Sequence, residues 1–236
     1  MSHAREGNAA VFSHALTGFA HPARNVSALG VEPGMKVADF GSGSGAYVLA
    51  IAEALAGSGQ VYAIDIQKDL LRRTKNEAEK KGYKNVEILW ADLEAPLGSK
   101  IADDALELVL VSNLLFQIED KRQVLHEAKR ILRPNGRLAV IDWAERSGHA
   151  GSAGVREGVG KREFPVSEGS ERSERWKTEG FQGGMGPHKD DVVKKEDVLT
   201  LARAVELTFV KEFPVGAHHY GLIFRKQGKM HNKITV

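Results

Sequence analysis

Two kinds of apolar segment alternate along this 236-residue chain, and their order predicts a sheet covered by helices. Short runs of strand length occupy residues 36–40, 60–66, 86–90, 106–112 and 137–143. Segments with helical spacing lie between them, at 46–56, 69–81 and 121–132. The run at 106–112 is almost continuously apolar, which is typical of a strand buried on both faces. This alternation favours an α/β domain with a parallel sheet between two helical layers.

The C-terminal third predicts one more helix and two more strands. Val198, Leu201, Ala202 and Val205 recur at helical spacing in a segment that begins near Glu196. Two strand-like runs follow at 207–215 and 218–225, joined by a reverse-turn signal at 214–217. Such a hairpin does not belong to a plain dinucleotide-binding half.

Three segments lie outside this pattern. Residues 1–24 place Phe12, Leu16 and Phe19 on one helical face, which fits either a helix packed on the core or a cap over a site. Residues 146–183 are rich in Gly, Ser and mixed charges, and we expect a flexible insertion there. Residues 227–236 resemble a frayed tail, and we expect residues 1–236 to form a single domain.

Composition narrows the classes of function. The chain has no cysteine, which excludes disulfides and thiolate sites, and its net charge of +2 does not favour nucleic acid as a partner. We expect no membrane span, no signal peptide and therefore a cytoplasmic location. No metal constellation is convincing. His218 and His219 are adjacent in an expected strand and so face opposite sides, which favours solvated or structural roles.

The segment KVADFGSGSGAY, residues 36–47, carries the strongest chemical signal. It predicts a strand, a tight turn containing Gly41, Gly43 and Gly45, and then a helix. This spacing differs from the GxGxxG of dinucleotide-binding folds. Asp39, two residues before the first glycine, suits a cationic group such as an amino group and is poorly placed beside a pyrophosphate.

Two further acids follow the next two apolar runs. Asp65 and Asp92 end strands that we expect to share one sheet edge, where open α/β folds bind ligands. Asp65 suits ribose hydroxyls or, alternatively, the start of the following helix. The alternative for Asp92 is a surface acid in a loop.

The motifs VADFGSGSG, VYAIDIQ, WADLE, LVLVSNLLFQ and HEAKRILRPNGRLAVIDW resemble, in order and spacing, those of class I S-adenosylmethionine-dependent methyltransferases. The chain is most similar to the group of ubiquinone/menaquinone biosynthesis C-methyltransferases, over roughly residues 25–142 and 184–226. The resemblance implies a three-layer, Rossmann-like, doubly wound sheet of seven mostly parallel strands. The last strand then enters antiparallel between its neighbours.

The resemblance implies S-adenosylmethionine as cofactor, with a role for each matching residue. Asp39 then holds the amino group, Asp65 the ribose hydroxyls, and Ile66 packs on the adenine face. Asp92 accepts a hydrogen bond from the adenine amine and the backbone N–H of Leu93 donates one to the ring. The methionine half lies against the three glycines at positions 41, 43 and 45.

Three residues are candidates on the acceptor side. Asn113 follows strand 106–112, where the resembled enzymes line the junction of cofactor and acceptor, and Phe116 is placed to wall an apolar acceptor. His188 is a candidate general base because imidazole titrates near neutrality. The segment 112–116 lacks the prolines of some N-methyltransferases, which disfavours methylation of DNA bases or glutamine.

These observations predict direct methyl transfer to a small-molecule acceptor. Two alternatives stay open: methylation of RNA or protein with the 146–183 insertion as a docking element, and cofactor binding without catalysis. An NAD-dependent oxidoreductase is disfavoured by Asp39 and the glycine spacing. The acceptor and the oligomeric state are left open.

Overall fold

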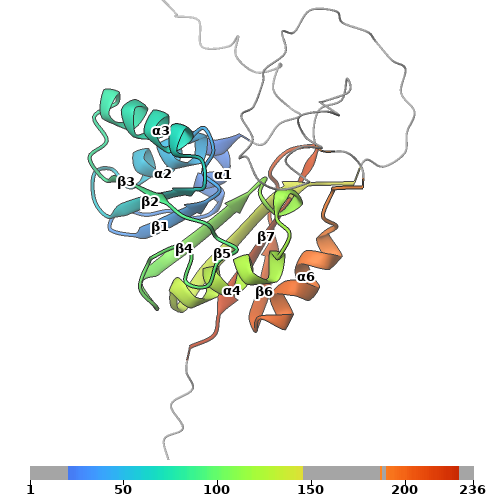
Figure 1. Ribbon diagram of the computed structural model, residues 1–236. Coiled ribbons are helices and arrows are strands. Elements are labelled where there is room, and N and C mark those ends of the chain that lie inside the picture. The colour runs from blue at the N-terminus through green and yellow to red at the C-terminus, as the bar shows by residue number, and fades with distance from the viewer. Residues whose placement is uncertain (1–20, 146–186, 188–189, 229–236) are drawn as a thin grey trace, which may run out of the picture.

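The computed structural model describes residues 21–145, 187 and 190–228, and most of them form or cover one seven-stranded sheet. The strand order is β3-β2-β1-β4-β5-β7-β6 (Figure 1). All pairings among β1 to β5 are parallel, whereas β7 runs antiparallel to both β5 and β6. The strands are β1 Lys36–Phe40, β2 Gln60–Asp65, β3 Val86–Trp90, β4 Leu106–Ser112, β5 Leu132–Trp143, β6 Leu207–Glu212 and β7 His219–Lys226. The predicted fold class is thereby confirmed.

Helices cover both faces of the sheet and give three layers (Figure 1). They are α1 Pro22–Ala28, α2 Ala46–Ala54, α3 Lys68–Lys80, α4 Lys121–Ile131 and α6 Lys195–Ala204, with a short 3-10 helix η1 at Leu115–Gln117. One core cluster joins α1, α2 and α3 to one face of the sheet. A second cluster joins α4 and α6 to the other face.

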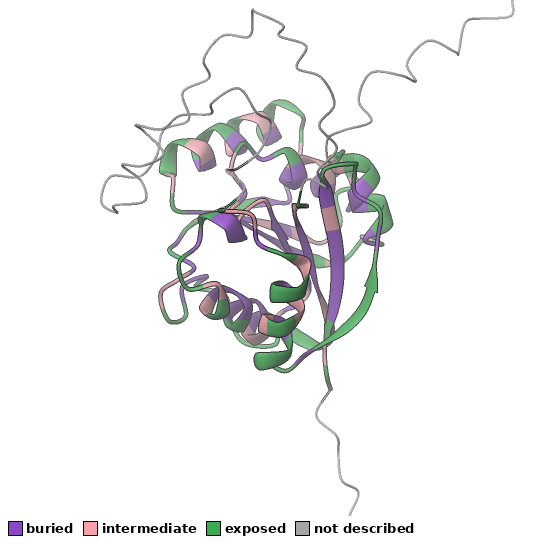
Figure 2. Cartoon of the chain, turned by 90° about the vertical axis from the view of Figure 1, so that its right-hand side faces the viewer, coloured by how far each residue is buried: buried purple, intermediate pink, exposed green. Residues whose placement is uncertain are grey.

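The central strands are buried because side chains alternate between these two clusters. In β4, Leu108 and Leu110 belong to the α1–α2–α3 side, whereas Val109 and Val111 belong to the α4–α6 side. Burial runs along the central strands, whereas outward helix faces are exposed (Figure 2). This explains the continuous apolar run that the sequence shows at residues 106–112.

Parallel pairing brings the ends of β1 to β5 to one edge, which we call the carboxyl edge. Asp39 and Asp65 lie at or near the ends of β1 and β2, and Asn113 directly follows β4. Because β7 is antiparallel, it begins at this edge, where His219 pairs with Trp143 at the end of β5. The candidate residues of the sequence therefore meet at one side of the sheet.

The structure also differs from the expected elements. The sequence did not predict α1 or η1, since seven and three residues are too few to show a periodic pattern. β5 begins at Leu132, which pairs with Leu106 across an irregular register, although Pro134 predicted a later start. Phe12, Leu16, Phe19 and the predicted insertion at 146–183 lie outside the described residues.

Candidate functional site

The glycine turn after β1 is fastened to β2. The amides of Gly41 and Ser42 both donate to the carbonyl of Ile64, at 2.8 and 3.0 Å. The amide of Gly43 donates to Oδ2 of Asp65 at 2.9 Å. The backbone φ values of Gly41, Gly43 and Gly45 are +68°, +51° and +79°, a region that L-residues rarely adopt. The sequence prediction of a strand, a tight turn and a helix is confirmed.

The three glycines serve different needs. A Cβ atom at Gly41 would lie 2.7 Å from Leu114, and one at Gly45 would lie 2.5 Å from Thr74, so these two positions are required for packing. A Cβ atom at Gly43 would meet nothing nearer than 3.9 Å. Gly43 is therefore the position where bare backbone leaves space for a ligand.

Asp39 is a buried acid without a compensating partner. It is 2% exposed, and in the described part of the chain no donor contacts its carboxylate. Burial, reinforced by the charge of Asp65, raises its pKa to about 8. A cationic group placed here would restore the charged carboxylate, which is what an ammonium ligand supplies.

Asp65 orders the turn and the start of α3. Its Oδ1 accepts from the amide of Gln67 at 2.8 Å, while Oδ2 holds Gly43. The helix N-cap is Gln67 itself, and no side chain caps that helix. A carboxylate has about four acceptor positions, so these two bonds leave capacity for ribose hydroxyls.

The end of β3 and the residue after β2 form an exposed apolar surface. Ile66 is 48% exposed and Trp90 is 51% exposed. The indole of Trp90 donates to the carbonyl of Ile66 at 2.9 Å, and the ammonium of Lys68 lies 3.8 Å from its ring centroid. Trp90, which the sequence reasoning passed over, therefore fixes the backbone beside the expected adenine site.

Asp92 is exposed after β3, and one oxygen accepts from the amide of Glu94 at 2.9 Å. This bond turns the chain locally, as Asp often does, and leaves the second oxygen for another donor. The side chain of Leu93 is buried, so only its backbone is a candidate contact.

Asn113 has a strained backbone and a partnerless side-chain oxygen. Its φ is +52°, and its amide donates to the carbonyl of Ile141 at 2.8 Å. Its Oδ1 is buried with no hydrogen-bond partner. Phe116 is only 9% exposed and packs in the α4–α6 core cluster, so little of its ring is open to an acceptor. His188 lies outside the described residues.

Asp142, near the end of β5, is a residue that the sequence reasoning missed. It is fully buried, and it accepts from the amides of Leu115 at 3.1 Å and Trp143 at 2.8 Å. Burial raises its pKa to about 7, although these backbone bonds oppose the rise. The available signal was its position, since it follows an apolar run as Asp39 and Asp65 do. Asp142 ties η1, and with it the loop after Asn113, to β5.

The two adjacent histidines separate as expected of neighbouring strand residues. His218 is exposed, whereas His219 is 8% exposed and its ring lies 4.3 Å from that of Trp143, measured between centroids. Neither ring nitrogen of His219 has a hydrogen-bond partner among the residues that the structure describes.

The hydrogen-bonding capacity left unused by the described residues at this edge matches the groups of S-adenosylmethionine. Asp39 suits the ammonium, Asp65 suits the ribose hydroxyls and Gly43 leaves room beside the turn. The buried hydroxyl of Ser42 and the amide oxygen of Asn113 add two unsatisfied polar atoms. The residues present therefore fit this cofactor.

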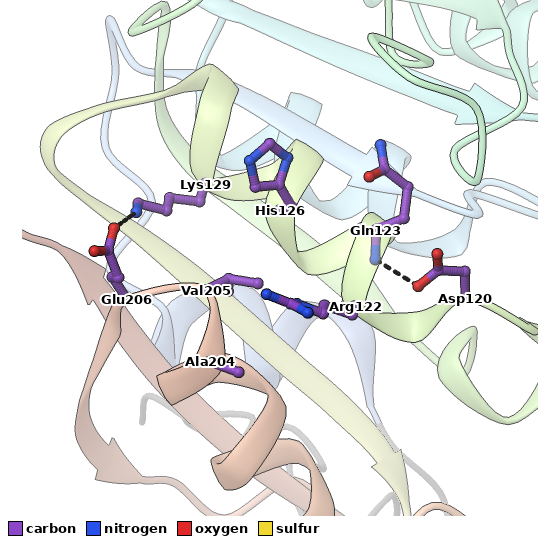
Figure 3. Close-up of a pocket in the computed structure, with 8 residues that line it drawn as sticks. All are labelled: Asp120, Arg122, Gln123, His126, Lys129, Ala204, Val205 and Glu206. Carbon is purple, nitrogen blue, oxygen red and sulfur yellow. Dashed lines mark hydrogen bonds and ion pairs between the residues drawn. The ribbon is translucent and has the colours of Figure 1, made fainter.

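A hollow of about 480 Å³ lies elsewhere, on the outside of α4 and the end of α6 (Figure 3). Its walls are largely charged, and Lys129 pairs there with Glu206 at 2.5 Å. None of its lining side chains carries a buried, partnerless polar atom. Unlike the carboxyl edge, it shows no sign of a ligand.

Within residues 21–145, 187 and 190–228, no group of three or more potential metal ligands lies together. In the same residues, no helix combines the length and the apolar character needed to cross a bilayer.

A family model described as "Methyltransferase domain" matches residues 31–179, which is more than half of the chain. The chain belongs to this family. Together with the fold and the glycine turn, the match places it in the family of class I S-adenosylmethionine-dependent methyltransferase domains, as the sequence motifs predicted.

Three curated relatives illustrate the range of the family. A demethylmenaquinone methyltransferase of Bacillus velezensis is 26% identical over 123 residues, covering 52% of this chain and 51% of the relative. A ubiquinone/menaquinone biosynthesis C-methyltransferase of Hahella chejuensis is 32% identical over 117 residues, 49% of this chain and 46% of the relative. An arsenite methyltransferase of Aquipseudomonas alcaligenes is 34% identical over 119 residues, 48% and 34% of the two chains. The chain spans about half the length of the quinone-pathway relatives and a third of the arsenite enzyme.

Solved structures agree on the fold. An S-adenosylmethionine-dependent methyltransferase of Aquifex aeolicus superposes with a TM-score of 0.66 at 21% identity, covering 88% of this chain and 90% of that one. The cyclase SpnF superposes with a TM-score of 0.62 at 15% identity, covering 87% and 80%. The fold therefore hosts more than one chemistry, and the acceptor has to be argued from the site.

Proposed function

We propose that this chain transfers the methyl group of S-adenosylmethionine to a small-molecule acceptor. The observation that supports this most strongly is Asp39, a fully buried acid without a donor, next to a glycine turn with open space at Gly43. The family to which the chain belongs uses this methyl donor. We further propose that residues 1–236 are one methyltransferase domain.

In this proposal the protein binds the methyl donor and aligns it with the acceptor. S-adenosylmethionine supplies an electrophilic methyl on a sulfonium, which needs little further activation. Asp39 holds the ammonium, Asp65 the ribose and Asp92 the adenine amine, with Ile66 and the backbone of Leu93 beside the adenine ring. Fixing the donor this firmly lowers the entropic cost of aligning it with the acceptor.

The acceptor approaches from the ends of β4 and β5. Asn113 has a free amide oxygen there, and Asp142 holds its loop in place through Leu115. Relatives named for demethylmenaquinone and for arsenite suggest that small molecules are the place to begin. Phe116 and His188 remain predictions for the acceptor side.

The test is methyl transfer from S-adenosylmethionine labelled in its methyl group. The purified chain is incubated with 1,4-naphthohydroquinone, arsenite with a thiol reductant, total RNA and mixed protein, each in parallel. Labelled product from a small molecule, lost in Asp39→Asn, supports the proposal. Label that enters only RNA or protein would replace it with a macromolecular acceptor.

A second control separates catalysis from mere binding. If S-adenosylhomocysteine binds tightly but no acceptor is methylated, the chain is a cofactor-binding protein and the proposed reaction is wrong. If neither S-adenosylmethionine nor S-adenosylhomocysteine binds, the assignment of the glycine turn to this cofactor is wrong.

A further inference from the structure

His219 is buried at the carboxyl edge, and the described residues around it offer its imidazole no hydrogen-bond partner. Its side chain is 8% exposed, yet both ring nitrogens lack a hydrogen-bond partner. Buried polar side chains are nearly always paired, so a partnerless imidazole needs an explanation. A neutral imidazole has one donor and one acceptor nitrogen, and both are unused here.

The position of His219 is set by strand pairing. It opposes Trp143 in the antiparallel β5–β7 ladder, and the two rings lie 4.3 Å apart between centroids. β4 and β7 flank β5 on either side. Because the backbones of neighbouring strands lie about 4.8 Å apart, the backbones of Asn113 and His219 are separated by roughly 10 Å across the end of β5.

Other partnerless polar atoms lie on the same side of the sheet. By alternation, His219 shares a face with Ile223, and Ser112 shares a face with Leu110, both in the α1–α2–α3 cluster. The amide oxygen of Asn25 in α1 also lacks a partner among the described residues, and the buried hydroxyl of Ser112 has only the hydroxyl of Tyr47 within reach. The amide nitrogen of Asn25 is bound to the hydroxyl of Tyr47 at 2.8 Å.

These groups lie away from the residues that we assign to the cofactor. Asp39 is on β1, and both β4 and β5 separate it from β7. The cofactor residues Asp65 and Asp92 follow β2 and β3, which are still further along the sheet. A ligand that satisfies His219 is therefore the second substrate.

We propose that His219 binds the methyl acceptor through a hydrogen bond to a hydroxyl or carbonyl group remote from the methylated atom, with Trp143 beside it. The proposal rests on the methyl transfer proposed above. It assigns binding, not proton removal, to this imidazole. Burial, assisted by His218, lowers the pKa of His219 to about 4, so the ring stays neutral near pH 7 and offers both a donor and an acceptor.

The effect of replacing His219 on stability distinguishes a ligand-binding role from a structural one. An unpaired polar group is costly in the free protein, so replacing it with an apolar residue of similar size is neutral or stabilising. His219→Leu should therefore keep or raise the thermal midpoint. It should also bind S-adenosylhomocysteine within about twofold of the wild type.

The kinetic arm uses 1,4-naphthohydroquinone or whichever small molecule of the panel is methylated. His219→Leu should raise KM for that acceptor at least tenfold, the loss of one good hydrogen bond. His219→Gln, which keeps a donor and an acceptor, should recover part of the affinity. His218→Leu is the matched control, since this adjacent histidine is exposed, and it should change none of these values.

Two results would overturn the proposal. One is an unchanged KM in His219→Leu. The other is a thermal midpoint that falls by more than about 5 °C together with cofactor affinity, which would make His219 a structural residue. If the wild type methylates no acceptor, the proposed function fails separately, and the thermal midpoint of His219→Leu still decides whether the imidazole is structural.

Discussion

At the scale of residues, the site is defined by polar groups that the fold buries without pairing. Asp39 is the clearest example, because its carboxylate is 2% exposed and no donor offsets its burial. A cation that binds beside such a carboxyl group favours its ionised form, so the group must lose its proton when the cation binds. Binding of S-adenosylmethionine should therefore be coupled to a proton.

The first prediction concerns this proton. With a pKa of about 8, Asp39 is mostly protonated in the free protein at pH 7 and must ionise to hold an ammonium. Binding at pH 7 should release close to one proton, seen by calorimetry as a heat that depends on the buffer's ionisation enthalpy. Affinity should rise with pH up to about 8. Equal heats in phosphate and Tris would contradict the assignment.

The raised pKa of Asp39 also makes the stability of the folded protein fall as pH rises. The folded pKa of about 8 lies above the ordinary 3.8, so between these values the folded state holds a proton that the unfolded state has lost. The contribution of Asp39 is complete below about pH 4 and is lost as pH rises through 8. Asp39→Asn should flatten the fall of the thermal midpoint over this window.

The second prediction separates the glycines. Gly43→Ala and Gly45→Ala both place a side chain at positive φ, which costs roughly 1–2 kcal/mol. Only the second also forces a Cβ atom to 2.5 Å from Thr74. Gly45→Ala should therefore lower the thermal midpoint more, while Gly43→Ala should lower the affinity for S-adenosylhomocysteine at least tenfold. Wild-type affinity in Gly43→Ala would show that no ligand approaches this position.

The candidate acids of the proposed cofactor side could be singled out from the sequence because each lies at or shortly after the end of an apolar run. Asp39, Asp65 and Asp92 were singled out by that position together with the glycine turn and the family resemblance, and their roles stay predictions. The burial of His219 could not be predicted, since it depends on pairing with Trp143, which is 76 positions earlier in the chain. The burial of Phe116 likewise follows from η1, a turn that no periodic pattern reveals.

At the scale of elements, the loop after β4 is fixed by one acid of β5. Asp142 binds the amide of Leu115 at the start of η1 and that of Trp143 in its own strand. Asp142 thus couples the segment that carries Asn113 to the strand that carries Trp143.

The third prediction tests this coupling. Asp142→Ala leaves the amides of Leu115, Phe116 and Trp143 without this acceptor, at about 1–3 kcal/mol each, and should lower the thermal midpoint by several degrees. Asp120→Ala is the comparison, since Asp120 is exposed and caps α4 through Gln123 at a typical value of about 1 kcal/mol. Equal effects of the two changes would mean that Asp142 does not anchor η1.

Elements with a long or continuous pattern were predicted well. The bounds of β1, β3 and β4 match the predicted ones, because apolar runs between polar residues mark strands sharply. The sequence did not predict α1, whose burial is set by packing against α2 and by other contacts distant in sequence rather than by its seven residues. Arg137 of β5 illustrates this, since its guanidinium donates at 2.7 Å to the carbonyl of Leu29, the C-cap residue of α1.

At the scale of the whole molecule, strand order explains why chemistry gathers at one edge. Parallel pairing brings the ends of β1 to β5 together, and the antiparallel β7 adds its first residue to them. The proposed cofactor residues lie on the β3–β2–β1 half and the proposed acceptor residues on the β4–β5–β7 half. The two substrates would meet near Asn113, where the halves join.

The central claim is that this edge binds S-adenosylmethionine through Asp39 and Asp65. The most direct measurement is a calorimetric titration of S-adenosylmethionine into the wild type and Asp65→Asn, with NAD as a control ligand. We expect binding to the wild type, a loss of about 1.5–3 kcal/mol in the variant, and no binding of NAD. Equal affinity in the variant, or tighter binding of NAD, would contradict the account.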